Sequence, residues 1–160
     1  MEKYIVTREE IEQYQGLEKT HFLNANAPRV NKSLGDVTGL EGIGFHIIEV
    51  APGKDSTELH RHLYEEECVY ILDGEAEATI GDELVSVKAG DFIGYRAGGC
   101  AHKLHNHGDV PLRCIVVGQR LAHDVVDYPE QEKRLFRNQG LDWNLVDMDN
   151  ITKPSAGKKT

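Results

Sequence analysis

Short alternating runs of apolar and polar residues fill the middle of the chain. From Glu75 to Ile80, three polar residues alternate with Ala76, Ala78 and Ile80, so the two sets point to opposite faces of a strand. Similar runs, rich in β-branched and aromatic residues and separated by glycine turns, follow one another closely. The expected strands are 45–50, 60–62, 68–72, 75–80, 84–87, 91–95, 102–106 and 112–117. Such a series is typical of an all-β sandwich or barrel.

The segments on either side have weaker patterns. Thr7 and Glu10 fit a capping box, which predicts a short helix from Thr7 to Tyr14. Residues 17–42 show little periodicity, and we expect them to form an arm with one or two edge strands. Residues 127–149 are polar with scattered apolar positions, and we expect a helix and a closing strand there.

These patterns predict one folded domain with extensions. A length of 160 residues suits a single domain with a sizeable core. The last residues are expected to be disordered, as chain ends often are. The expected parts are an N-terminal arm (1–43), a β-barrel core (44–118), a C-terminal extension packed on the barrel (119–153) and a disordered tail (154–160).

Four side chains in the predicted strands have the chemistry of metal ligands. His60 and His62 are two residues apart, so they project from the same face of a strand. Glu67 begins the next strand-like run, and His102 follows a glycine-rich loop and opens another run. Three imidazoles and a carboxylate suit Zn, Fe, Mn, Ni or Cu better than Ca or Mg. The sequence therefore predicts a site for one divalent transition metal.

The spacing around these residues resembles the first motif of the cupin superfamily. That motif runs from a glycine through His-x-His to a glutamate and a second glycine. The matching residues are Gly53, His60, His62, Glu67 and Gly74. One residue more than usual separates the first glycine from the first histidine. Glu65 and Glu66 compete for the ligand position, but only Glu67 leaves the six-residue gap to Gly74 that the motif has.

A second stretch resembles the other cupin motif. The matching residues are Gly90, Gly98, His102 and Asn106. Arg96 stands where proline is usual, and one extra residue separates Gly98 from His102. The resemblance covers residues 44–118 and is to small single-domain bacterial cupins grouped with mannose-6-phosphate isomerases. It implies a double-stranded β-helix, or jelly roll, with a metal inside the barrel, held by His60, His62, Glu67 and His102.

Composition and charge limit the binding partners and the cellular location that we expect for the protein. A net charge of −9 argues against non-specific nucleic-acid binding, which needs clustered Lys and Arg. The first ten residues lack the apolar stretch of a signal peptide, and no apolar run approaches the roughly 20 residues of a membrane span. Cys68, Cys100 and Cys114 have no metal or redox spacing, so reduced thiols are the simplest account. We therefore expect a cytoplasmic protein without nucleic-acid or membrane partners.

Resemblance to cupins leaves the activity open, because a fold does not settle chemistry. We expect the protein to act on or bind a small oxygenated molecule, and a metal-dependent isomerase or epimerase is the first interpretation. An Fe(II)-dependent dioxygenase and a non-catalytic ligand-binding or sensing protein are the alternatives. We also expect a homodimer, because the arm at 17–42 is too long for an ordinary loop and a jelly roll leaves unpaired strand edges.

The pocket beside the metal is expected to be small and mainly apolar. Its expected lining is Ala76, Ala78, Ile80, Val85, Val87, Leu104 and Val116. Few polar groups besides the metal ligands and Asn106 are expected to point inward, and no basic cluster favours sugar phosphates. His46 is expected to be a partly buried histidine with its hydrogen bonds satisfied, and Glu65 and Glu66 a solvated entry to the next strand.

Overall fold

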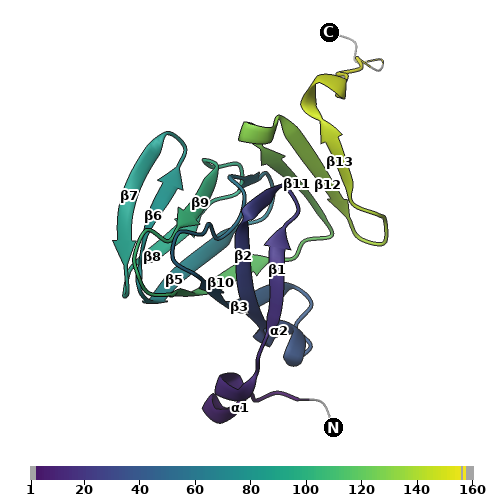
Figure 1. Ribbon diagram of the computed structural model, residues 1–160. Helices are drawn as coiled ribbons and strands as arrows, with labels where there is room; N and C mark the ends of the chain where they lie inside the picture. Colours follow the sequence, from purple (N-terminus) through teal and green to yellow (C-terminus); the bar gives the residue numbers. More distant parts are fainter. Residues whose placement is uncertain (1–2, 156, 158–160) are drawn as a thin grey trace.

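The structure is a computed structural model that describes residues 3–155 and 157, and it consists mainly of short antiparallel strands (Figure 1). The strands are β1 (Leu17–His21), β2 (Asn24–Ser33), β3 (Ile43–Val50), β4 (Arg61–His62), β5 (Glu67–Asp73), β6 (Glu75–Ile80), β7 (Glu83–Lys88), β8 (Phe92–Tyr95), β9 (His102–His105), β10 (Leu112–Gln119), β11 (His123–Tyr128), β12 (Lys133–Asn138) and β13 (Asn144–Asp147). The helices are α1 (Arg8–Gln13) and α2 (Leu34–Val37), with 3₁₀ turns η1 (Pro129–Gln131) and η2 (Met148–Asn150). No helix of this part of the chain is long and apolar enough to cross a membrane.

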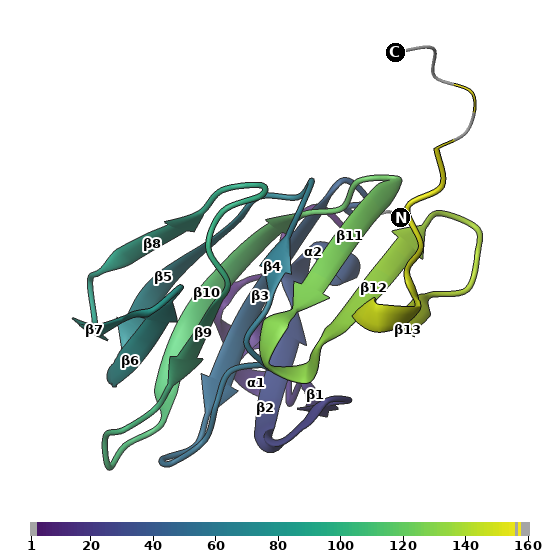
Figure 2. The ribbon, with the colours of Figure 1, turned by 90° about the horizontal axis from the view of Figure 1, so that it is seen from above.

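The strands form two facing layers, which Figure 2 shows from above. One layer is a six-stranded sheet in the order β1-β2-β3-β10-β5-β8. The other consists of a three-stranded sheet, β7-β6-β9, and a four-stranded sheet, β13-β12-β11-β4. A single antiparallel bridge between His60 and His102 links these two smaller sheets. The expected all-β jelly roll is confirmed, and two of the predicted metal ligands lie at the junction within its second layer.

The hydrophobic core lies between the layers. In β6 the apolar side of the alternating pattern is buried, with Ala76 and Ala78 fully inaccessible to solvent. They pack with residues of the six-stranded sheet such as Val50, Ile71 and Leu112. The prediction for Val85 is wrong, because this residue is 42% exposed on β7, a strand at the edge of its sheet.

The N-terminal part of the chain extends the six-stranded sheet. The predicted capping box is present, because the Thr7 side chain accepts from the Glu10 amide and the Glu10 carboxylate accepts from the Thr7 amide. β1 and β2 then continue the sheet beyond β3, with β1 at its edge. The arm thus contains strands, as expected, and it reaches the same side of the molecule as the predicted ligands.

The C-terminal part differs from the prediction. Instead of a helix and one strand, β11, β12 and β13 form an antiparallel sheet, and the described residues after Asp127 include 3₁₀ turns but no α-helix. Val126, Tyr128 and Leu135 form a second, smaller core. Val126 and Tyr128 are two residues apart in β11, so their side chains point to the same, buried face of that strand. The four-part division of the chain stays a prediction, and the expected disordered tail at 154–160 lies largely outside the described residues.

Candidate metal centre

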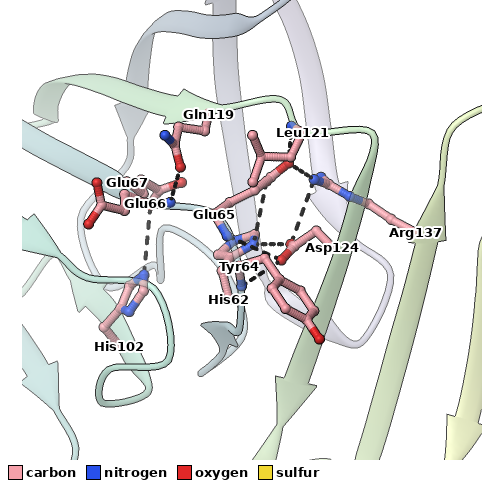
Figure 3. A network of polar contacts seen from close by, with 10 residues as sticks. All are labelled: His62, Tyr64, Glu65, Glu66, Glu67, His102, Gln119, Leu121, Asp124 and Arg137. Atoms are coloured by element: carbon pink, nitrogen blue, oxygen red, sulfur yellow. Dashed lines mark hydrogen bonds and ion pairs between the residues drawn. The ribbon is translucent and has the colours of Figure 1, made fainter.

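His60, Glu67 and His102 lie together between the two layers. His60 immediately precedes β4, Glu67 begins β5 and His102 begins β9. One ligand atom from each of the three lies within 4.8 Å of the others. The distance from His102 Nε2 to Glu67 Oε1 is 3.7 Å, too long for a hydrogen bond (Figure 3). With ligand distances of about 2.0–2.2 Å, two donors on one ion lie about 3–4 Å apart, so this spacing fits a shared metal.

His62 lies beside this group but is held differently. Its ring centroid is 5.1 Å from that of His60. Its Nδ1 is 2.6 Å from Asp124 Oδ2, and His62 forms a second group of possible ligands with Glu65 and Asp124. The structure thus brings three of the four predicted ligands together and turns one ring nitrogen of the fourth toward an acidic neighbour. Nε2 of His62 is the nitrogen that remains for a metal shared with His60.

All three histidines use Nδ1 for a contact with an oxygen. His60 Nδ1 is 2.9 Å from the carbonyl of Glu58, and His102 Nδ1 is 3.2 Å from the carbonyl of Cys100. In His62 the corresponding oxygen is the Asp124 carboxylate. Because these oxygens accept hydrogen bonds, a proton lies on Nδ1, and in the neutral form of each ring the lone pair is on Nε2. Histidines that bind metals are usually oriented in this way.

Nε2 of His102 has no hydrogen-bond partner within the described part of the chain, although it is buried. An unpaired nitrogen in such a place is costly unless a ligand satisfies it. The ring is fixed by Tyr95, which stacks on it with centroids 3.5 Å apart and an interplanar angle of 5°. Three imidazole nitrogens and a carboxylate suit a borderline transition metal. The donor set therefore fits a metal of the predicted class without selecting one.

Charge in the centre follows from burial and from the neighbouring groups. Burial, and next the proximity of His102, lowers the pKa of His60 to about 3, so this ring is neutral at pH 7. Burial by itself raises the pKa of Glu67, but the contact with His102 and the nearby His60 outweigh it and lower that pKa to about 2. Both residues are therefore in the protonation state that a metal ligand needs.

A network of charged side chains supports His62 from the C-terminal sheet (Figure 3). Asp124, in β11, is fully buried and also accepts hydrogen bonds from the amides of Tyr64 and Glu65. Arg137, in β12, pairs with Glu65 and lies 3.6 Å from Asp124. Burial opposes the charge on His62, yet the hydrogen bond to Asp124 raises its pKa.

The three adjacent glutamates have different environments. Glu65 is only 4% exposed, and besides Arg137 it accepts from the amide of Leu121 at 2.8 Å. The expectation that Glu65 is solvated is therefore wrong, while Glu66 is exposed as expected. Glu67 alone of the three belongs to the group with His60 and His102. The network with Asp124 was missed, because nothing local in the sequence relates residues 60 positions apart.

A cavity of about 460 Å³ opens beside the centre and is lined by His60, His62, Glu67 and His102. Its walls come from both extensions. The arm contributes Lys19, Thr20, His21, Phe22, Arg29 and Asn31, and the C-terminal sheet and its loop contribute Val126, Tyr128, Leu135, Arg137 and Trp143. A jelly roll alone would leave this site open, so the segments outside the barrel determine what can enter it.

The expected lining of the cavity is only partly right. Leu104 and Val116 line it, whereas Ala76 and Ala78 belong to the core and do not. Asn106 is also absent from the lining, because its amide nitrogen donates to the carbonyls of Val50 and Val110. The expectation of few inward polar groups and no basic cluster is wrong. Four basic side chains line the cavity, namely Lys19, Arg29, Lys103 and Arg137.

Comparison with known proteins identifies the family. The family described as "Cupin domain" matches residues 46–118. The chain is 50% identical to a proposed sugar phosphate isomerase from Acidithiobacillus ferrooxidans, covering 94% of this chain and 96% of that one with a TM-score of 0.90. The protein belongs to the cupin family. Its resemblance to small bacterial cupins is thereby confirmed.

Two further relatives were found. A cupin-superfamily sugar phosphate isomerase from Silicibacter pomeroyi is 23% identical, covers 88% of this chain and 90% of its own, and has a TM-score of 0.76, which shows the shared fold. An uncharacterised protein of Methanocaldococcus jannaschii is 39% identical over 66 residues. That match spans 41% of this chain and about half, 52%, of the relative.

Proposed function

We propose that this cupin is a divalent-metal-dependent isomerase of a small oxygenated substrate, with His60, His62, Glu67 and His102 as the metal ligands. The observation that carries the proposal is the orientation of the three imidazoles. Each has Nδ1 against an oxygen, and the Nε2 of His102 is buried without a hydrogen-bond partner in the described chain. We include His62 in the ligand set because Asp124 contacts only its Nδ1, which leaves Nε2 for the metal.

When bound, the metal supplies a Lewis acid that polarises a carbonyl or hydroxyl oxygen of the substrate. Tyr95 stacks on the ring of His102, one of the proposed ligands, and lines the cavity. Its hydroxyl is buried without a partner in the described residues, and burial raises its pKa, so it stays protonated. It is therefore available to donate a hydrogen bond to a substrate oxygen.

A proton must also move between carbon atoms during isomerisation of an aldose to a ketose. His46 lines the same cavity, and burial together with Arg120 lowers its pKa. It is therefore neutral at pH 7, and accepting a proton at Nδ1 would replace the contact that this nitrogen makes with the Asn31 amide nitrogen at 3.3 Å. The expectation that His46 is partly buried agrees with the structure, and we assign it the role of proton acceptor.

The experiment is an isomerase assay on metal-loaded protein with a panel of aldose and ketose phosphates, the class suggested by the name of the Acidithiobacillus relative. The proposal predicts turnover that stops on chelation, returns with added metal and is lost in His102→Ala. Tight binding of a sugar phosphate without turnover would contradict it in favour of a binding protein. Oxygen uptake that requires added Fe(II) would contradict it in favour of a dioxygenase.

A further inference from the structure

Arg29 is a largely enclosed cation in the wall of the cavity. It lies in β2, and its Nη1 donates to the carbonyl of Ser56. Its Nε is buried and has no hydrogen-bond partner in residues 3–155 and 157. In the same residues its guanidinium forms no ion pair with a carboxylate. Burial lowers the pKa of Arg29, although the charge of Glu67 acts to raise it. A buried charged donor without a partner costs free energy unless a ligand binds it.

Lys19 lies directly opposite Arg29. The two residues pair across the antiparallel strands β1 and β2, so their side chains leave the sheet on the same face, and both line the cavity. Like charges opposite each other destabilise a strand pair. Lys19 also forms no ion pair with a carboxylate of the described chain. Two adjacent cations without counter-ions therefore face the cavity.

The other charges around the cavity do not neutralise this pair. Arg137 forms ion pairs with Glu65 and Asp124, and Lys103 forms one with Asp55 at 3.9 Å. Glu67 is the one carboxylate among the described lining residues, and a metal would share its charge. The cavity is thus positive in a chain whose net charge is −9.

We infer that Arg29, with Lys19 beside it, binds a terminal oxyanion of the substrate, a phosphoryl or a carboxylate group. Nη1 is held by Ser56, which orients the guanidinium, and Nε remains to donate to the oxyanion. The planar guanidinium suits such groups better than an ammonium does. The inference rests on the proposed function for the part of the substrate that reaches the metal, and it adds the group that anchors the other end.

The test is calorimetric titration of the metal-loaded protein with inorganic phosphate and, separately, with acetate. The wild type is compared with Arg29→Gln, with Arg29→Lys and with Arg113→Gln. Arg113 is an exposed arginine of the same sheet that pairs with Asp73 and does not line the cavity, so it controls for the loss of one charge.

At least one probe should bind the wild type, and its Kd should rise about tenfold or more in Arg29→Gln, because a charge-assisted hydrogen bond is lost. Arg29→Lys should fall between the two, and Arg113→Gln should match the wild type. The probe that binds more tightly identifies the anchored group as phosphoryl or carboxylate. Arg29→Lys, which keeps the charge, provides the comparison if Arg29→Gln does not fold.

Equal binding by the wild type and Arg29→Gln would overturn the inference, since the probe would then sit on the metal. Failure of both probes to bind the wild type would overturn it as well. The metal content of every sample is measured in parallel. A protein without isomerase turnover that still binds phosphate through Arg29 would contradict the proposed function alone, so the two failures are distinguishable.

Discussion

In each of the three histidines, the oxygen partner of Nδ1 affects how Nε2 can bind a metal. In His62, Nδ1 faces the buried carboxylate of Asp124, whereas in His60 and His102 it faces a backbone carbonyl. A carboxylate partner fixes the tautomer and increases the basicity of the nitrogen that would bind a metal. Asp124 is therefore a positioning residue for His62, supplied by a strand outside the segment 46–118 that matches the family.

Asp124→Asn should weaken metal binding about tenfold or more. Asparagine has nearly the same shape, but it lacks the charge that favours Nδ1–H on His62. The dissociation constant for zinc is measured by competition with a chelating dye, and Asp149→Asn, at an exposed position, is the control. Unchanged zinc affinity in Asp124→Asn would show that this carboxylate does not support the metal centre.

Individual site residues differed in how well sequence predicted them. His60, Glu67 and His102 fall within motifs of fixed spacing, so their proximity could be predicted without a structure. Asp124 could not be, because it lies 62 residues after His62 and meets it only through the pairing of β11 with β4. Arg29 was missed for a similar reason, since a single arginine in a weakly patterned arm gives no indication that it faces a cavity.

The element that joins the barrel to the C-terminal sheet is the short strand β4. It pairs with β11 through only two residues, Arg61 and His62. Asp127 strengthens this junction, because its buried carboxylate binds Arg61 at 3.0 Å from one side and Arg134 of β12 at 2.6 Å from the other. Three strands are therefore tied together at one side chain next to the candidate ligands.

Asp127→Asn should lower the free energy of unfolding by about 1–3 kcal/mol at pH 7. Burial alone raises the pKa of Asp127, but hydrogen bonds from Arg134 and Arg61 lower it below its ordinary 3.8. Its contribution is therefore present above pH 3.8 and is lost as the pH falls through the lowered pKa. Urea unfolding at several pH values measures this contribution.

The matched control is Glu12→Gln, which breaks an exposed pair with Arg8 and should change stability by less than about 0.5 kcal/mol. The difference between the wild type and Asp127→Asn should shrink below pH 4. A difference that stays constant down to pH 2 would contradict the assigned role of the carboxylate.

Alternation of apolar and polar residues predicted the barrel strands because one side of each is buried in a shared core. It failed after Asp127, where the sheet is small and much of each strand is exposed. Leu141, Trp143 and Leu145 are all at least 40% exposed, so the pattern of burial there is too weak to separate a strand from a helix. The prediction of the cavity lining was wrong for another reason, because the side of β6 that carries the alanines faces the core and the arm covers the site.

On the scale of the whole molecule, the six-stranded sheet ends in two unpaired edges, β1 and β8. Exposed edges are potential sites for pairing with another chain. We predict a homodimer, in which the arm of one chain contacts the other. Sedimentation at micromolar concentration should give about twice the chain mass of 17.9 kDa. A single species at the monomer mass would contradict this prediction.

We propose that His60, His62, Glu67 and His102 together hold one divalent metal. Elemental analysis of purified protein, with His62→Ala compared in parallel, tests it most directly. We expect about one metal per chain in the wild type. In His62→Ala we expect a sharp loss of metal with the fold retained, because the core between the layers is apolar. Full metal occupancy in His62→Ala, or none in a wild type supplied with Zn, Fe, Mn or Ni, would contradict it.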